Sequence, residues 1–230
     1  MFAIDIDGTI ATANVSEYAD YFRKKFQIPL NDIEYITVWW QLFDHPDITG
    51  YSHEHPRRYA NVVNGLMDSL TSVRQPRPLP HACDQVERLA RMGVVKYLVL
   101  KYTDMLTPEG AQDWLTTHGF PCPDDIVYCP TVLHKITIIL REPGEHVLID
   151  NQWAYLVASL RMLEVDACYN DRLQRALNTI LRRLTIVAFG SAAIPERLAF
   201  PGLRLIALPS WDQLEEISGM LQREPAGQRV

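Results

Sequence analysis

Two hydrophobic periods alternate along most of the chain. Residues 2–6 form a short apolar run that is typical of a buried strand, and similar runs follow at 94–100, 126–129 and 146–149. Between these runs apolar residues recur every three or four positions. This spacing predicts helices around Val86–Met92, from Thr107 to Gly119, and over residues 132–141 and 152–162. Strands that alternate with helices imply a parallel sheet whose two faces are covered, so the predicted fold class is α/β.

The C-terminal third of the chain is harder to interpret. A strand is predicted near Val165–Cys168, and residues 184–189 and 203–208 each have the composition of a strand. Residues 211–220 predict a terminal helix with Ser210 as its cap. The stretch from Asn170 to Leu208 is longer than a minimal core of this class needs, and the pattern alone does not assign it a role.

Residues 14–75 have a different character. They are rich in aromatic and polar residues with mostly helical spacing, and they end in a proline cluster at residues 76, 78 and 80. We therefore expect a core domain made of residues 1–13 and 76–230, with a small helical cap domain, residues 14–75, inserted after the first strand.

Composition and charge limit the classes of partner. The chain of 230 residues carries a formal net charge of −6, which argues against a nucleic-acid polymer as partner but permits a small anionic substrate. The four cysteines form no metal-binding or disulfide pattern and are expected to be reduced thiols. Because no signal peptide or membrane-spanning run is recognised, the expected protein is cytoplasmic and binds no membrane. The oligomeric state stays open.

The sharpest chemical signal follows the first predicted strand. Asp5 and Asp7 lie two residues apart, so in a strand both side chains project to the same side. Gly8 permits a tight turn, and Thr9 adds a hydroxyl that we assign to substrate binding. Paired carboxylates suit Mg²⁺, and a carboxylate beside such an ion is able to attack phosphorus while the second exchanges a proton.

The segment from Phe2 to Thr9 resembles, without a gap, the first motif of the haloacid dehalogenase-like (HAD) superfamily. That resemblance implies a Rossmann-like core, Asp5 as nucleophile and Asp7 as general acid and base. It also implies Mg²⁺ as cofactor, held by the Asp5 carboxylate and the Asp7 backbone carbonyl. Asp150, at the end of the 146–149 strand, matches the family's further metal ligand, with Asn151 where many members have a second acid.

Two other family motifs are matched unequally. Lys135 precedes the Asp150 strand and is the candidate cation that neutralises the phosphoryl oxygens. The family's Ser or Thr after the second core strand is represented by Thr103, which comes two residues later than strand spacing would place it. Lys101 occupies the expected position. The sequence therefore leaves open whether this motif is Thr103 or is lost.

The aromatic insertion and the segment from Ser210 to Leu214 resemble the 5'(3')-deoxyribonucleotidase branch of the superfamily, in which cap aromatics stack on a nucleobase. Trp39, Trp40 and Phe43 are the candidates for that contact. The alternative interpretation is that these aromatic residues form the small hydrophobic core of the cap.

The sequence thus predicts a Mg²⁺-dependent phosphatase that hydrolyses a small phosphomonoester through an aspartyl-phosphate, with a nucleoside monophosphate as a candidate substrate. One alternative is a binding or regulatory module that has lost turnover, which the altered second motif and Asn151 favour. A second is a receiver-type phosphoacceptor, against which the long insertion and the Asp-x-Asp-Gly-Thr string argue.

Overall fold

A computed structural model of the chain describes residues 1–12, 15–31, 42, 45–59, 76–100 and 108–221. The chain divides into two compact units: a core unit, Met1–Thr9 with Pro80–Val230, and an inserted unit, Ile10–Leu79. In the described part of the chain, no helix has both the length and the apolar character that crossing a bilayer requires.

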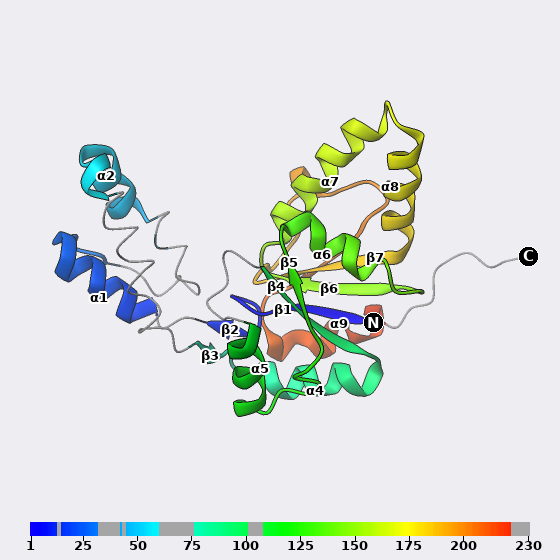
Figure 1. The fold of residues 1–230 in the computed structure, drawn as a ribbon, viewed down its shortest axis with the longest axis horizontal. Coiled ribbons are helices and arrows are strands. Elements are labelled where there is room, and N and C mark those ends of the chain that lie inside the picture. The colour runs from blue at the N-terminus through cyan, green and yellow to red at the C-terminus, as the bar shows by residue number, and fades with distance from the viewer. Residues whose placement is uncertain (13–14, 32–41, 43–44, 60–75, 101–107, 222–230) are drawn as a thin grey trace, which may run out of the picture. The chain divides into compact units, whose positions relative to one another are not determined.

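A six-stranded sheet with every neighbouring pair parallel forms the centre of the core unit (Figure 1). Its spatial order is β5-β4-β1-β6-β7-β8. The strands are β1 (Phe2–Asp5), β4 (Val95–Leu100), β5 (Ile126–Cys129), β6 (His146–Asp150), β7 (Leu184–Phe189) and β8 (Arg204–Leu208). The chain builds outward from β1 to β5 on one side and then returns to place β6 on the other. The carboxyl ends of β1 and β6 therefore form a topological switch point, where α/β proteins bind ligands.

Helices cover both faces of this sheet (Figure 1). One face carries α6 (Val132–Ile139), α7 (Trp153–Ala167) and α8 (Asp171–Arg183). The other carries α4 (Ala82–Met92), α5 (Pro108–Thr117) and α9 (Leu214–Leu221), which follows the short 3₁₀ turn Trp211–Gln213. A second 3₁₀ turn, Glu196–Leu198, lies between β7 and β8. The predicted α/β fold class is confirmed.

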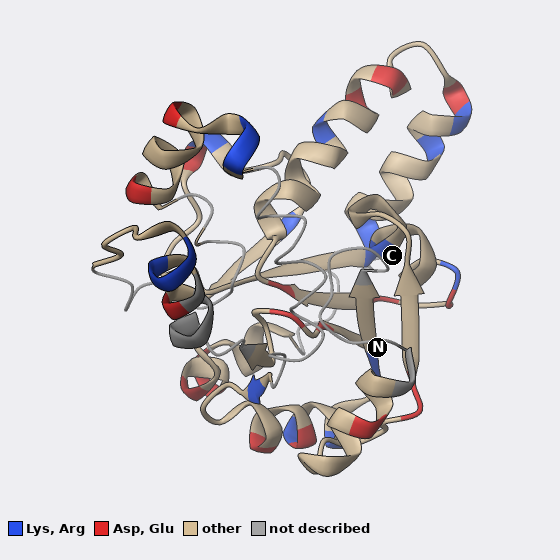
Figure 2. Cartoon of the chain, turned by 60° about the vertical axis from the view of Figure 1, so that its left-hand side comes forward, with Lys and Arg blue, Asp and Glu red and all other residues tan. Residues whose placement is uncertain are grey.

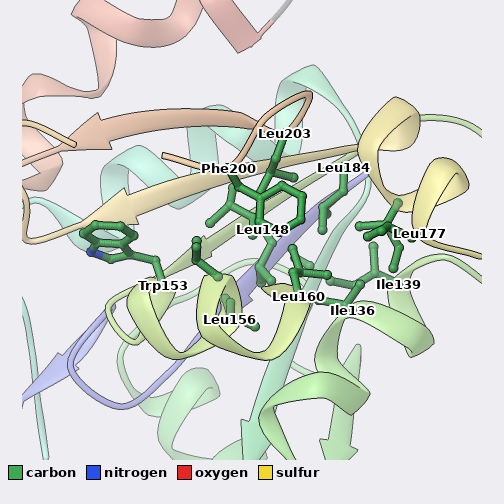
Figure 3. Close-up of a cluster of buried hydrophobic side chains, with 14 of the residues drawn as sticks. Ile136, Ile139, Leu148, Trp153, Leu156, Leu160, Leu177, Leu184, Phe200 and Leu203 are labelled. Atoms are coloured by element: carbon green, nitrogen blue, oxygen red, sulfur yellow. The ribbon is translucent and has the colours of Figure 1, made fainter. Parts of the chain in front are cut away.

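A cluster of buried hydrophobic side chains lies between the sheet and the α6–α8 layer (Figure 3). This cluster joins Leu148 of β6 with Ile136 of α6, Leu156 and Leu160 of α7, and Leu177 of α8, all of them fully or almost fully buried. Burying such a side chain contributes about 1.5–3 kcal/mol, so this layer holds α6 firmly against the centre of the sheet. That position matters because α6 carries Lys135.

One predicted strand is wrong. Residues 165–168 are not extended, because α7 continues to Ala167 and Cys168 is its helical C-terminal cap. The short run with a β-branched valine was mistaken for a strand, whereas the three-to-four spacing of apolar residues in fact persists from Leu156 onward. The strands predicted at residues 184–189 and 203–208 are confirmed as β7 and β8. Before them lies α8, which the pattern did not predict; it begins at a side-chain cap, since Asn170 accepts hydrogen bonds from the backbone of Arg172 and Leu173.

The inserted unit contains α1 (Val15–Phe26), α2 (Pro46–Glu54) and a two-stranded antiparallel ribbon of β2 (Ala11–Thr12) and β3 (Arg77–Pro78). The helical spacing seen in the sequence is realised in α1. Its Phe26 ring lies 5.5 Å from Phe22 and 5.1 Å from Tyr51 of α2, measured between centroids. These three rings make a small aromatic core inside the unit. The ribbon brings the two ends of the insertion together.

Candidate active site

The site begins at the carboxyl ends of two neighbouring parallel strands. Asp5 is the last residue of β1 and Asp150 is the last of β6, and the strands pair in a register that sets Ile4 beside Ile149. The backbone turns sharply after β1, because Gly8 adopts a φ of 77° and the N–H of Thr9 donates to the carbonyl of Ile6 at 3.2 Å. Only glycine takes such a φ without strain, which explains the residue after Asp7.

Lys135 joins the two strand ends. Its Nζ lies 2.5 Å from Asp5 Oδ1 and 2.8 Å from Asp150 Oδ2, and all three side chains are buried. The local sequence explains the position of the ammonium. Thr131 caps α6 by accepting a hydrogen bond from the N–H of His134, and Lys135 follows in the first turn of the helix. The apolar neighbour Ile136 then anchors that turn in the core.

Thr9 ties the turn to the neighbouring strand and to the C-terminal segment. Its Oγ1 donates to Asp5 Oδ2 at 3.1 Å and accepts from the backbone N–H of Asn151, also at 3.1 Å. The backbone carbonyl of Thr9 accepts a 2.6 Å hydrogen bond from Trp211 Nε1, which is buried. Both oxygens of the Asp5 carboxylate are thus held by named donors, which fixes its orientation.

Burial dominates the electrostatics of Asp5. Removal from water raises its pKa to about 7; the ammonium of Lys135 opposes this rise, and the carboxylates of Asp150 and Asp7 add to it. For Lys135, burial acts against the charge, but the carboxylates of Asp150 and Asp5 outweigh it and raise the pKa of the ammonium above its ordinary value. The lysine therefore stays charged at neutral pH.

The cluster has a surplus of negative charge when it is fully ionised. The described residues place three buried carboxylates there, those of Asp5, Asp7 and Asp150, and one buried ammonium, that of Lys135. Hard oxygen donors with this surplus suit Mg²⁺, which keeps several waters and needs only one or two carboxylates. In the described residues no three acidic, histidine or cysteine side chains gather tightly enough to hold a metal by themselves. The donor set therefore fits a hydrated Mg²⁺ better than a metal enclosed by protein ligands alone.

Comparison with known proteins gives structural matches only. No protein-family model matches the chain, and no curated protein matches it. A haloacid dehalogenase-like hydrolase from Burkholderia xenovorans superposes with a TM-score of 0.51 at 16% identity, covering 97% of this chain and 98% of that protein. The chain has the HAD-like fold. Two hydrolases from other bacteria superpose with lower TM-scores.

Those two are a haloacid dehalogenase-like protein from Streptococcus pneumoniae, with a TM-score of 0.46 and 15% identity, and a hydrolase from Pseudomonas syringae, with 0.45 and 16%. The match to the former covers 95% of this chain and 97% of that one, and the match to the latter covers the same shares. The predicted Rossmann-like core is confirmed through the HAD-like fold.

Within that HAD-like fold the structure brings together four of the residues that the sequence singled out, namely Asp5, Thr9, Lys135 and Asp150. Asp7 is buried in the turn between Asp5 and Thr9. The other candidates lie outside the described residues: these are Thr103, Trp39, Trp40 and Phe43, and the question of Lys101 against Thr103 lies there too.

Two site residues were missed or undervalued by sequence reasoning. Asn151 was read as the substitute for a second acid, but its backbone N–H has a role of its own in binding Thr9 Oγ1. Trp211 was noticed only as part of a C-terminal segment, and no local pattern pointed to the Thr9 carbonyl 202 positions away. A tryptophan donates through its indole N–H wherever it is buried, so only the tertiary contact identifies the acceptor.

Proposed function

We propose that this protein is a Mg²⁺-dependent phosphohydrolase of small phosphomonoesters, and that Asp5 is its nucleophile. One observation carries the proposal: a buried carboxylate at the carboxyl end of the central strand is held by an ammonium on one oxygen and a hydroxyl on the other. The HAD-like fold supports a hydrolase with this arrangement. A receiver-type phosphoacceptor is disfavoured by that fold.

The proposed reaction has two steps. An Asp5 carboxylate oxygen attacks phosphorus, the bond to the leaving oxygen breaks, and Asp7 gives that oxygen a proton. A water molecule then attacks the aspartyl-phosphate, Asp7 takes a proton from it, and the phosphorus–carboxylate bond breaks to release phosphate and restore Asp5. Lys135 holds Asp5 in place and offsets the charge that collects on the phosphoryl oxygens, which is the main demand of phosphoryl transfer.

Mg²⁺ would be held by the Asp5 carboxylate, the Asp7 backbone carbonyl and Asp150, with water completing its shell. When bound, it supplies further positive charge to the phosphoryl oxygens. Asp150 reaches this position with one oxygen on Lys135 and the other accepting the backbone N–H of Gln152 at 2.7 Å. A carboxylate offers about four lone-pair sites, so both hydrogen bonds leave room for a metal contact.

We further propose a nucleoside monophosphate as the substrate class. The support is the resemblance of the aromatic insertion and the segment Ser210–Leu214 to the deoxyribonucleotidase branch. Sugar phosphates are the competing class, and Trp39, Trp40 and Phe43 are the residues whose replacement separates the two. Loss of nucleotide turnover with retained turnover of a small aryl phosphate is the result expected if these aromatics bind a base.

The decisive experiment measures phosphate release with and without Mg²⁺ from nucleoside monophosphates, sugar phosphates and an aryl phosphate. Asp5→Asn removes the nucleophile and is expected to lower kcat/KM by at least about 10⁴-fold. The matched control is Asp113→Asn, which makes the same change at an exposed position on α5 and should keep full activity. Metal-dependent release that survives in Asp5→Asn would contradict the proposed nucleophile.

A second candidate function is a HAD-like module that binds its ligand without turnover. The observation that favours it is Asn151, an amide at the position where a second acid would strengthen the metal shell. In that case the folded protein binds Mg²⁺ in a titration but releases no phosphate from any substrate in the panel. Asn151→Asp would then be expected to tighten Mg²⁺ binding, which calorimetry detects independently of activity.

A further inference from the structure

Helix α7 is apolar on two faces. Its inner face is buried in the core, where Trp153, Leu156 and Leu160 point at the sheet (Figure 3). This face is sufficient to attach the helix to the core unit. A surface helix normally carries charged and polar residues on its other side.

The outer face of α7 is apolar instead. Tyr155, Met162, Val165 and Tyr169 are 69%, 72%, 63% and 91% exposed. Ala158 is exposed as well. We call these five residues the α7 stripe; the last of them lies in the turn that follows the helix. Successive members are three, four, three and four positions apart, which is the spacing of the seam of a two-stranded coiled coil.

Helix α8, which forms a helical hairpin with α7, lacks such an exposed apolar face, so the stripe is a property of α7 alone. The two helices run side by side (Figure 1), and the exposed positions of α8 are mostly charged or amide residues. Charged positions gather on α8 and around the tip of the hairpin (Figure 2). The α7 stripe contains no charged residue, although Arg161, Glu164 and Asp166 lie on the same helix.

We propose that the α7 stripe is a self-association surface, and that a second copy of this chain binds it with its own α7 running antiparallel. The order of the stripe supports this occupant, because it is almost palindromic about Met162: tyrosine lies seven positions before and seven positions after it. A two-fold axis at Met162 sets Tyr155 beside Tyr169 of the second copy and the small Ala158 beside Val165. A self-complementary patch is what a two-fold interface requires.

The polar and charged residues on either side of the α7 stripe are compatible with this antiparallel pairing. Ser159 and Asp166 lie on the same side of it, and the two-fold axis brings the Asp166 carboxylate of one copy near the Ser159 hydroxyl of the other. Arg161, on the opposite side, does not face its own image, because its Nη2 donates to the carbonyls of Arg197 and Ala199 at 2.8 and 3.0 Å. No pair of like charges is therefore brought together at the seam.

The exposed area is of the right order for a dimer. Two tyrosines, a methionine and a valine at these exposures present on the order of 500 Å² per copy. A standard interface buries about 800 Å² per partner, so the stripe supplies the larger part and its polar flanks supply the rest. The tyrosines at both ends place their rings over the seam and leave their hydroxyls in water.

The test is the molar mass of the full chain in solution, measured by light scattering and sedimentation from about 1 to 100 µM. Wild-type protein is expected to dimerise in this range. Met162→Glu sets two carboxylates against each other at the axis and should weaken the dimer at least about a hundredfold, since like charges that meet in an interface cost several kcal/mol. The matched control, Gln174→Glu, adds the same charge at an exposed position on α8 and should remain dimeric.

A second measurement locates the axis. In a background with both exposed native cysteines changed, Cys122→Ser and Cys168→Ser, Met162→Cys should form an intermolecular disulfide under mild oxidation, and Gln174→Cys should not. A wild-type protein that is monomeric throughout the range would overturn the proposal. So would a Met162→Glu variant that stays as dimeric as wild type, because the interface would then lie elsewhere.

Discussion

The two ends of strand β6 each carry a buried polar residue, and they use it in opposite ways. His146 begins the strand and Asp150 ends it, and both are almost completely buried. Among the residues that the structure describes at the carboxyl end, carboxylates outnumber the ammonium of Lys135. At the amino end, the polar partners are mostly backbone carbonyls, gathered around one guanidinium.

That guanidinium belongs to Arg183, the last residue of α8. Its Nε donates to the carbonyl of Gly144 at 2.7 Å, and its Nη1 donates to that of Leu140 at 3.3 Å. Its Nη2 donates to the carbonyl of Glu142 and lies 3.1 Å from His146 Nε2. The planar five-donor fork of arginine suits several acceptors at once, so one side chain binds three carbonyls of residues 140–144.

The difference teaches where ligand chemistry is possible. In the amino-end cluster a guanidinium donates to carbonyls of the loop before β6, and the buried carboxylates of the described residues all lie at the other end of the strand. In the carboxyl-end cluster the described side chains carry more negative than positive charge. This cluster is therefore able to bind a cation, or a ligand that arrives together with a cation. An active site is often the place where a fold tolerates such an electrostatic cost.

The largest expected effect comes from removing Lys135, the cation that the described residues supply to the carboxyl-end cluster. Lys135→Met leaves Asp5 and Asp150 buried without their ion-pair partner, so we expect it to lower the free energy of unfolding by about 3–5 kcal/mol. Urea unfolding with a chelator present measures this loss. The matched control is Lys96→Met, which removes a half-exposed ion pair to Glu142 and should cost less than about 1 kcal/mol.

The cause of that loss is checked by a second substitution. Adding Asp5→Asn to Lys135→Met removes one of the uncompensated carboxylates, and it should recover a measurable part of the stability. If Lys135→Met unfolds at the same urea concentration as wild type, the lysine does not hold the strand ends together in solution. In either case the double variant lacks the proposed nucleophile and serves only as a stability probe.

A smaller effect is expected at the amino end. Arg183→Ala removes the donors to Gly144, Leu140 and Glu142 and should lower stability by about 1–3 kcal/mol, with kcat/KM unchanged because the cluster lies at the opposite end of the strand. Arg183→Lys keeps the charge but cannot reach three carbonyls, so it should recover only part of the loss. The adjacent Arg182→Ala is the control, with an expected change within about 0.5 kcal/mol.

Arg183 also shows what sequence reasoning reached and what it did not. Asp5 was found from the strand signal before it, and Lys135 and Asp150 were found because they match further motifs of the family that the sequence resembles. Parallel strands bring their carboxyl ends to one edge, which explains why Asp5 and Asp150 meet. Arg183 lies in the stretch that the pattern left unassigned, and its acceptors are backbone carbonyls 39 to 43 residues away, which no side-chain motif records.

The mistaken strand at Val165–Cys168 has a related cause. The apolar residues of α7 face both the core and the solvent, so the helix lacks the one-sided pattern by which an amphipathic helix is recognised. The same feature that misled the sequence prediction is the α7 stripe. A helix that is apolar on both its core face and its exposed face is therefore difficult to recognise from the sequence alone.

The smallest expected effect is a pH dependence of the free energy of unfolding that arises from His146, at the amino end of β6. Burial lowers the pKa of His146, and the Met1 ammonium and Arg183 lower it further, while Glu142 opposes them. The folded state therefore keeps His146 neutral at pH values where the unfolded chain, with a histidine pKa near 6.5, already binds a proton. Below about pH 6.5 the unfolded state binds more protons, so stability falls as pH falls.

His146→Gln lacks this titration, so we expect the stability difference between wild type and His146→Gln to be constant above about pH 7 and to shift against wild type as pH falls below 6.5. Urea midpoints from pH 5 to 8 measure the difference. His53→Gln removes an exposed histidine of the inserted unit and should follow the wild-type curve at every pH. Parallel curves for wild type and His146→Gln would mean that His146 takes up its proton as readily in the folded protein as in the unfolded chain, and that the two ends of β6 do not differ in the way that their hydrogen bonds imply.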